Sequence, residues 1–489
     1  MMGIKFNIKM SALRPYGAPS NKTSTPADIT NQLESDRGRI IQSASVRRLQ
    51  QKTQVFPLER NAAVRSRLTH SLEVQQNGRY IVKTLFKKLQ GREKELGLNG
   101  LAGAVESLVE MACLMHDIGN PPFGHFGEAA INGWFNSKQF KKFKAWKTVK
   151  GESLRKLLIK DLQNFEGNAQ AVRLTYSLQQ MNLTHAQTAA ILKYTRGAWE
   201  KREDKDPLSQ LKKKPGFYWS EREAVAKMCD ALEVQLGHRH PFTYIMEAAD
   251  DMAYCLADIE DAVEKGILNL SQLSGLIVKT FHALGGDVDA SNITSFNHSE
   301  KSLKRVVNEA IQASKTDVID GNHQFFIKLR INLIHHLVNH AANRFIDNIE
   351  TIYRGDFNQA LLEDDSVAMQ IVQTFKGIGY NHVFNHKEVQ TLELQGHQII
   401  TGLLDIYAKV LKLSGAKMSD LLSGNSDCLY EQLLFNRIDP KIRKAYQKAV
   451  KEQGGELEFY YRCRMIQDHI SAMTDHSAHD EYKTLMVAD

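Results

Sequence analysis

The sequence predicts an almost entirely α-helical protein. Apolar residues recur at intervals of three and four along most of its 489 residues, which is the spacing of one helix face. The chain has only 10 prolines and few of the alternating Val, Ile and Thr runs that strands need. With 42% hydrophobic residues it can bury a large core. We therefore expect an all-α fold.

Composition narrows the class of protein. The 63 Lys and Arg residues slightly exceed the 56 Asp and Glu residues, which permits a polyanionic ligand without requiring one. The five cysteines show no CxxC spacing and indicate reduced, buried thiols. No run approaches 18 apolar residues, and the first 30 residues hold no continuous apolar segment. We expect a soluble, cytoplasmic protein.

The first 34 residues are rich in Pro, Gly and Asn and predict a polar N-terminal arm that a partner subunit could order. Ser35 and Asp36 then open the folded part. No linker composition interrupts residues 35–489, so we expect one large domain, with the site built mainly by residues 35–265. The Gly, Asp and Asn of residues 285–298 predict a surface loop between helices.

A buried helix is predicted to end at His116 and Asp117. Its apolar residues, including Val105, Leu108 and Met115, recur at helical spacing, and Gly119 and two prolines stop it. An aspartate at the carboxyl end of a buried helix opposes the helix dipole unless a cation compensates. A bound metal ion would supply that cation.

Two other predicted helices bring further metal-binding residue types. One begins near residue 67 and carries His70 in its first turn. The other covers residues 246–263 and places Asp250, Tyr254 and Asp258 four residues apart, on one stripe of its surface. A single His-Asp pair occurs by chance, and an Asp-rich stripe can simply face solvent. The His116-Asp117 pair, with His70 and one aspartate of the Asp250-Asp251 cluster, would have the layout of a metal phosphohydrolase with open water positions.

After the two prolines, His125 and Glu128 stand three residues apart near the start of another helix. At this spacing the glutamate can hold the imidazole and raise its basicity, which suits a general acid or base beside the metal. The structural alternative is a capping glutamate with a packed histidine.

Three other patterns in the sequence suggest additional sites or contacts. His336 and His340 have a ligand spacing, but histidines of this kind are more often surface or interface residues. Lysines alternate with Phe140, Phe143 and Trp146 in residues 138–150, a pattern that could receive single-stranded DNA. The segment 460–486 has helical apolar spacing and should pack in the core or in an oligomer interface.

Six ordered motifs resemble one known family. They are ESDRGRII (34–41), RRLQQKTQVFP (47–57), RLTHS (67–71), HDIGNPP (116–122), FEGNAQ (165–170) and EAADD (247–251). The chain resembles the HD-domain deoxynucleoside triphosphate triphosphohydrolases, most closely the bacterial dGTPases. The resemblance implies an HD-type helical core elaborated with additional helices.

The same resemblance implies a role for each matching residue. The metal ligands would be His70, His116, Asp117 and Asp250, and an open site of nitrogen and oxygen ligands favours Mg or Mn over zinc. His125 and Glu128 would be the catalytic pair. The triphosphate would be held by Arg67, Asn168, Lys193, Tyr194 and Lys214. The sugar would be held by Gln54, Tyr254 and Asp258, and Glu393 could complete the guanine pocket.

The implied reaction is metal-dependent hydrolysis of dGTP, and of other deoxynucleotides where the site admits them, to deoxynucleoside and tripolyphosphate. Tyr254 beneath the deoxyribose would exclude a ribose 2′-hydroxyl. We expect a homo-oligomer, with a nucleotide or single-stranded DNA as a candidate effector. Two alternatives stay open: an HD-type nucleotide phosphodiesterase or 5′-nucleotidase, and a regulatory protein that binds nucleic acid without turnover.

Overall fold

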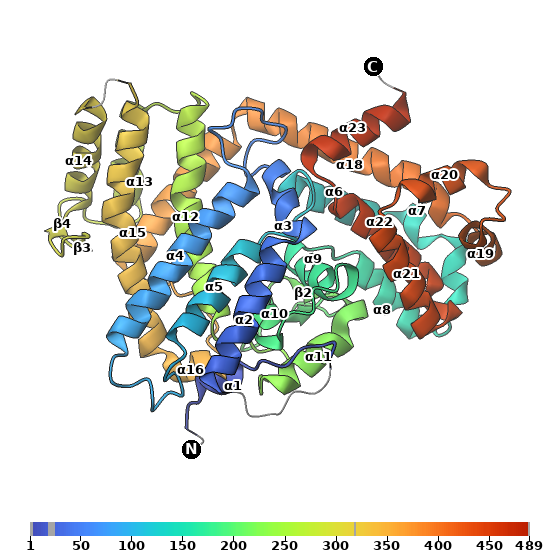
Figure 1. The fold of residues 1–489 in the computed structure, drawn as a ribbon. Helices are drawn as coiled ribbons and strands as arrows, with labels where there is room; N and C mark the ends of the chain where they lie inside the picture. The colour runs from blue at the N-terminus through green and yellow to red at the C-terminus, as the bar shows by residue number, and fades with distance from the viewer. Residues whose placement is uncertain (1–2, 18–24, 317–318, 488–489) are drawn as a thin grey trace.

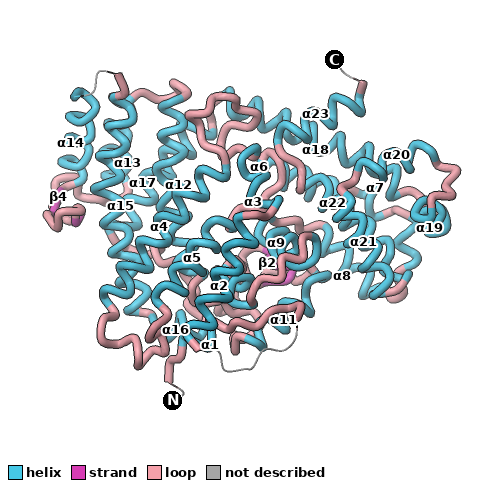
Figure 2. Tube along the Cα trace, in the orientation of Figure 1, coloured by secondary structure: helices cyan, strands magenta, loops and turns pink. Residues whose placement is uncertain are grey.

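The computed structural model describes residues 3–17, 25–316 and 319–487. Over these residues the chain folds into packed helices with two short sheets (Figures 1 and 2). Strand β1 (Arg196–Gly197) pairs in parallel with β2 (Pro215–Phe217), and β3 (Ile293–Thr294) pairs antiparallel with β4 (Glu300–Lys301). The prediction of an all-α fold is confirmed.

The α-helices up to residue 264 are α1 (Phe6–Lys9), α2 (Pro26–Ile41), α3 (Ala44–Arg48), α4 (Arg67–Lys88), α5 (Ala102–Met115), α6 (Gly124–Asn136), α7 (Lys138–Lys141), α8 (Glu152–Leu162), α9 (Gly167–Arg173), α10 (His185–Ala190), α11 (Arg222–Ala231) and α12 (Thr243–Glu264). Those that follow are α13 (Leu270–Ala283), α14 (Leu303–Thr316), α15 (Gly321–Asp347), α16 (Ile349–Arg354), α17 (Val367–Ile378), α18 (Lys387–Leu411), α19 (Gly415–Ser423), α20 (Leu429–Arg437), α21 (Pro440–Gln453), α22 (Glu458–Ser471) and α23 (Asp475–Met486). Short 3₁₀ or π turns are η1 (Leu49–Gln51), η2 (Lys144–Thr148), η3 (Leu174–Leu178), η4 (Trp219–Glu221), η5 (Gly379–Phe384) and η6 (Gly455–Leu457).

Helices α4, α5 and α12 pack against one another in the first of two hydrophobic cores (Figure 1). Helix α4 begins with a capping box, in which the Ser66 side chain accepts a hydrogen bond from the Thr69 N–H and the Thr69 side chain accepts one from the Ser66 N–H. Helix α5 is apolar on nearly every side and is buried almost from end to end. Helices α4 and α12 carry His70 and Asp250, and His116 and Asp117 directly follow α5.

The folded part begins earlier than the sequence predicted. Helix α2 starts at Pro26, because Thr25 and Asp28 form a capping box and a proline suits the first helical position. Phe6 of α1 is fully buried in the first core, and the His240 Nε2–H donates a hydrogen bond of 2.8 Å to the Lys9 carbonyl. Helix α2 thus begins before residue 35, inside the segment expected to be an arm. Residues 1–2 and 18–24 of the expected arm lie outside the described residues.

The second core contains side chains from α6, α8, α18 and α22. It also contains Phe140 and Trp146, which are almost completely buried, while the lysines around them are exposed. The interpretation of these rings as a platform for single-stranded DNA is therefore wrong for both of them. They are hydrophobic anchors of the short helices α7 and η2, and only Phe143 is partly exposed.

A buried ion pair lies inside the second core. The Asp161 carboxylate pairs with Arg464 and also accepts hydrogen bonds from the Trp219 N–H at 2.8 Å and the Tyr460 hydroxyl at 2.7 Å. Neither charged side chain has solvent exposure. The contact joins α8 to α22, which lies about 300 residues later in the chain.

The first part of the C-terminal segment packs in the second core, one of the two places that the sequence predicted, since α22 is buried from Phe459 to Ser471. Helix α23 follows after a short break and packs on α18, with only Asp475 and Ala478 buried among its described residues (Figure 1). The segment predicted as a loop, residues 285–298, does connect helices α13 and α14, but it contains strand β3 and the turn that leads to β4. The predicted helix over residues 246–263 is confirmed as the central part of α12.

Candidate active site

One cavity of about 480 Å³ gathers nearly all the predicted site residues. It lies where the two hydrophobic cores meet, since Met246 of the first core and Phe123 of the second both line it. The walls come from the starts of α4 and α6, the end of α5, α12, η5 and α18. The predicted residues that line it are Gln54, Arg67, His116, Asp117, His125, Glu128, Asn168, Lys193, Tyr194, Lys214, Asp250, Tyr254, Asp258 and Glu393.

Three side chains converge at the inner end of the cavity. The Nε2 atoms of His70 and His116 lie 3.3 and 3.4 Å from Asp250 Oδ1. Within the described ranges, these are the only three His, Cys, Asp or Glu side chains whose donor atoms meet within 4.8 Å of one another. Two imidazole nitrogens and a carboxylate oxygen are the donor set of a divalent transition metal or a magnesium-type site with open positions.

Asp117 lies at the edge of this cluster. Its Oδ1 is 3.6 Å from His116 Nε2 and accepts a hydrogen bond from Asn120, while its Oδ2 is paired with the Arg67 guanidinium. Arg67 thus neutralises the carboxylate in this arrangement. The structure brings all four predicted metal ligands together, three of them in direct convergence and the fourth beside them.

Local contacts prepare His116 as a ligand through one nitrogen. Its Nδ1 lies 2.7 Å from the Cys113 carbonyl, which fixes the tautomer that leaves Nε2 free of a proton when the ring is neutral. Although burial opposes it, the charges of Asp117 and Asp250 raise the pKa of His116 to about 9. Burial also opposes ionisation of Asp250, but His116 and Lys193 hold its pKa well below the usual value. The cluster therefore attracts positive charge.

His125 and Glu128 form the predicted pair on the first turns of α6. His125 Nδ1 lies 3.1 Å from Glu128 Oε2, and the histidine side chain is 85% exposed toward the cavity mouth. Glu128 Oε1 accepts a hydrogen bond of 2.9 Å from the Gly167 N–H. Burial would raise the pKa of Glu128, but the hydrogen bond and charge of His125 and the charge of Lys214 lower it. The glutamate is held as a charged acceptor for the imidazole.

Basic side chains line the cavity between these two groups. Lys193 Nζ lies 3.5 Å from Asp250 Oδ2, and Lys214 Nζ lies 3.2 Å from Glu166 Oε1. Asn168 Nδ2 also donates to both Glu166 oxygens, at 3.0 and 2.9 Å. Glu166 thus occupies polar groups that were predicted to hold the triphosphate. The sequence analysis assigned it no role, because its position in the FEGNAQ motif does not reveal these contacts.

Buried polar atoms line the cavity at Gln54 and Asp258. Among the described residues, Gln54 Oε1 has no hydrogen-bond partner, whereas Asp258, which is only 2% exposed, interacts with the Tyr254 hydroxyl. Burial, together with the charge of Asp261, raises the pKa of Asp258 well above its usual value. Unpaired buried polar atoms are costly. They favour a ligand with hydroxyl groups beside Gln54.

Tyr254 forms the floor between the metal cluster and Asp258. Its ring stacks on Phe384 of η5, with centroids 6.5 Å apart and planes at 23°. Phe384 and Tyr380 line the cavity and were not predicted from the sequence, since nothing in the local pattern around residues 379–384 separates them from core aromatics.

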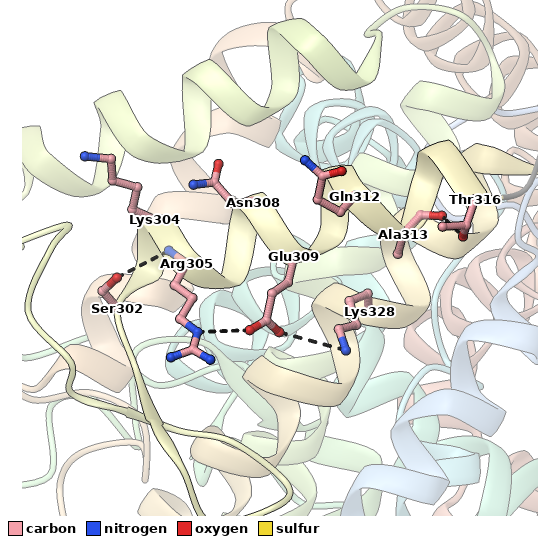
Figure 3. Close-up of a pocket in the computed structure, with 9 residues that line it drawn as sticks. All are labelled: Ser302, Lys304, Arg305, Asn308, Glu309, Gln312, Ala313, Thr316 and Lys328. Atoms are coloured by element: carbon pink, nitrogen blue, oxygen red, sulfur yellow. Dashed lines mark hydrogen bonds and ion pairs between the residues drawn. The ribbon is translucent and has the colours of Figure 1, made fainter.

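A second hollow lies far from these groups, along α14 and beside α15 (Figure 3). Its acidic residue, Glu309, is already paired with Arg305 at 3.1 Å and lies 3.9 Å from Lys328. The histidines of α15 also have structural partners, since His336 Nδ1 accepts a hydrogen bond from the Thr294 N–H and His340 Nε2 lies 2.9 Å from Asp364. Neither feature adds ligands to the cluster at His116.

Comparisons with known proteins agree with this geometry. Residues 67–205, which include α4, α5 and α6, match the HD domain. A probable deoxyguanosinetriphosphate triphosphohydrolase from Pseudomonas aeruginosa is 50% identical over 99% of both chains. The chain belongs to the deoxyguanosinetriphosphate triphosphohydrolase family. Family members from Serratia proteamaculans and Yersinia enterocolitica are each 46% identical over the full length of both chains.

This family membership confirms the resemblance drawn from the six motifs. The full-length match also covers the later helices, including α18 and α23, which the HD domain match leaves out. In the described part of the chain, no helix has both the length and the apolar character that a membrane crossing requires.

Proposed function

We propose that this protein hydrolyses dGTP to deoxyguanosine and tripolyphosphate with a divalent metal, and so controls the deoxynucleotide pool of the cytoplasm. One observation carries the proposal: a single cavity holds a His/Asp cluster, a His–Glu pair and a row of basic side chains. Relatives named for this reaction are 46–50% identical over essentially the whole chain. Other deoxynucleoside triphosphates would be hydrolysed where the site admits their bases.

The proposed metal ligands are His70, His116, Asp117 and Asp250, and the proposed ion is Mg²⁺ or Mn²⁺. The donor set fits, because the two imidazoles and the carboxylate converge while Asp117 can join once Arg67 turns to a phosphate. A bound ion would lower the pKa of a water ligand and neutralise charge on a phosphate oxygen. An open nitrogen and oxygen site suits six-coordinate ions.

The triphosphate is proposed to lie along the basic side of the cavity. Arg67 would contact the α-phosphate, and Asn168, Lys193, Tyr194 and Lys214 would hold the rest of the chain of phosphates. Lys214 and Asn168 now contact Glu166, so a triphosphate would compete with that carboxylate for the same donors. Lysine suits this task as a mobile point charge.

His125 is proposed to handle the proton of the reaction. Water attacks the α-phosphorus, the bond to the sugar 5′-oxygen breaks, and a proton must reach that oxygen as deoxyguanosine leaves. His125 would give this proton or accept one from the attacking water, and Glu128 would set the imidazole tautomer and stabilise its charged form through the 3.1 Å contact. The exposed ring is free to reach the substrate.

The sugar is proposed to lie beside Gln54 and Asp258. These two side chains would bind the 3′-hydroxyl, which would give the buried Gln54 Oε1 a hydrogen-bond partner. Tyr254, held by Phe384, would pack beneath the deoxyribose. A ribose 2′-hydroxyl would meet the ring without space or a partner, so GTP should be a poor substrate.

Base selection and assembly are proposed together. Glu393 lines the cavity near its mouth and could read the guanine edge. Exposed apolar side chains belong to or adjoin the cavity lining: Phe126 and Tyr380 line it, and Leu394 follows Glu393 in the chain. They support a homo-oligomer in which a neighbouring subunit covers this rim.

A nucleotide or single-stranded DNA effector is also proposed, with the exposed lysines of residues 138–150 as its electrostatic contact.

The first experiment is a product analysis. The purified protein is incubated with Mg²⁺ or Mn²⁺ and, separately, with each of the four deoxynucleoside triphosphates and GTP, and products are resolved by ion-exchange chromatography. Deoxyguanosine with tripolyphosphate is the expected result. Monophosphate or free phosphate would instead indicate a phosphodiesterase or nucleotidase, and no turnover would favour the regulatory, nucleic-acid-binding alternative.

The role of His125 is tested by replacing it with alanine. His125→Ala should lower kcat by roughly 10²–10⁴-fold while the bound metal stays unchanged, because general acid–base catalysis supplies an effect of that size. His282→Ala, an exposed histidine on α13, is the control and should keep full activity. Loss of metal from the His125 variant, or an unchanged kcat, would refute the role.

A further inference from the structure

We propose that Asp475 is a positioning residue that couples the sugar end of the cavity to the catalytic pair. Its carboxylate binds both Thr53, which precedes Gln54, and Phe123, the N-cap residue of helix α6. This inference rests on the proposed function, because it gives the two ends of the cavity their roles in binding the sugar and in proton transfer.

Asp475 is the first residue of α23 and is only 1% exposed. Its Oδ2 accepts hydrogen bonds from the Thr53 N–H at 2.9 Å and from the Thr53 hydroxyl at 2.5 Å. Its Oδ1 accepts a hydrogen bond of 2.9 Å from the Phe123 N–H. The two oxygens thus bind two segments that lie about 70 residues apart in the chain and both line the cavity.

The Phe123 contact acts on the catalytic end. Phe123 adopts a left-handed conformation with φ of 61°, which is uncommon for a residue other than glycine and is kept only where surrounding contacts hold it. It immediately precedes α6, whose first turns carry His125 and Glu128. Its ring packs tightly on α18, where a Cβ at Gly396 would lie 2.5 Å from the ring. Asp475 fixes its backbone from the other side.

The Thr53 contacts act on the sugar end. Thr53 precedes Gln54, and it forms an isolated antiparallel bridge with Ser66, the N-cap residue of α4. The neighbouring Lys52 carbonyl accepts a hydrogen bond of 2.8 Å from the Arg67 N–H. This short stretch therefore runs from the proposed sugar contact to the start of the helix that carries Arg67 and His70.

Helix α23 is anchored well enough to act as a fixed support. The Tyr482 ring lies directly over Gly402 of α18, where an added Cβ would lie 2.3 Å from it. Glu481 accepts a hydrogen bond of 2.7 Å from the Tyr407 hydroxyl and is paired with Arg437. Thr474 caps the helix through a capping box with Ser477. Asp475 is thus held by a scaffold outside the cavity.

An asparagine cannot make the same contacts. It has the shape of the aspartate, but it offers one acceptor oxygen, and its NH₂ group would face a donor on the other side. Asp475→Asn can therefore hold Thr53 or Phe123, but not both. A displacement of about 1 Å at a reacting group can lower a rate roughly 10²-fold.

The test compares dGTP with 2′,3′-dideoxy-GTP, which lacks the 3′-hydroxyl. The wild-type protein should prefer dGTP in kcat/KM. Asp475→Asn should lower kcat for dGTP about 10- to 100-fold and reduce that preference toward the level of Gln54→Ala. The double variant Asp475→Asn with Gln54→Ala should lose no further preference, because coupled residues are not additive. Metal content and Tm are measured for each variant.

The control is Asp439→Asn, since Asp439 also caps a helix with its carboxylate but lies outside the cavity. It should keep kcat and the preference for dGTP. A purely structural role of Asp475 would lower Tm while kcat per folded molecule and the preference stay at the wild-type level, and that result overturns the inference.

Two further outcomes are also decisive. If Asp475→Asn does not fold, Thr53→Val removes only the hydroxyl contact and should still reduce the preference for dGTP, and an unchanged preference overturns the inference. If the wild-type protein turns over both nucleotides equally, the proposed sugar contacts fail. The Asp475 inference is then decided by kcat alone, and an unchanged kcat rejects it.

Discussion

Replacing Gly396 by alanine should lower kcat strongly with little loss of stability. The new Cβ would lie 2.5 Å from Phe123 Cγ and 2.7 Å from its Cβ. Carbon atoms rest at about 3.5–4.0 Å, so the ring must retreat by about 1 Å. Phe123 directly precedes the helix that carries His125, and a shift of that size can cost roughly 10²-fold in rate.

The stability change should be small because two effects oppose each other. Overpacking costs about 1–3 kcal/mol, while alanine in a helix interior gains about 0.5–1 kcal/mol over glycine. Steady-state kinetics with dGTP, together with Tm, measure both quantities. Gly275→Ala on α13, where an added Cβ meets no atom within 4 Å, is the control and should leave kcat unchanged. A Gly396→Ala protein with kcat within about two-fold of wild type would show that the Phe123 ring does not support His125.

Three other predictions concern stability and specificity. Asp161→Asn leaves Arg464 charged and buried, which should lower the free energy of unfolding by about 3–5 kcal/mol. For a chain of this length the Tm should fall by about 3–5 °C. Scanning calorimetry measures the Tm, and an unchanged Tm would contradict this prediction. Burial lowers the pKa of His240 to about 4, below the unfolded value of about 6.5. The contribution of the neutral ring to the free energy of unfolding is therefore fully present above pH 6.5. About 3 kcal/mol of that free energy is lost as the pH falls to 4. Urea unfolding at several pH values should show a flatter dependence for His240→Gln. Tyr254→Ala should raise the GTP to dGTP ratio of kcat/KM by about ten-fold or more, and an unchanged ratio would argue against the ring as the ribose barrier.

The parts of the site that could be predicted from sequence are those encoded locally. The helical spacing around His116 and Asp250 predicted buried helices, and the three-residue step from His125 to Glu128 predicted their contact, because neighbours on a helix face meet whatever the rest of the fold does. The motifs then related these helices to one another through the family.

The parts that were missed depend on contacts across long separations. Asp475 and Phe384 reach the cavity region from the last quarter of the chain, and no local pattern marks them. The start of helix α2 was not recognised in the sequence, because nearby Pro and Gly hid the capping box of Thr25 and Asp28. Phe140 looked exposed among lysines, although one side of that short helix faces the second core.

The contact between Asp475 and Phe123 also sets a time order for making the enzyme. Asp475 follows Phe123 by 352 positions. A ribosome that adds about 5–20 residues per second therefore synthesises Asp475 roughly 20–70 s after Phe123. During that interval the emerging chain already carries His70, His116, Asp117 and His125, but the support for α6 has not been synthesised. Nascent chains should therefore stay below full hydrolytic activity until α23 has left the ribosome and docked.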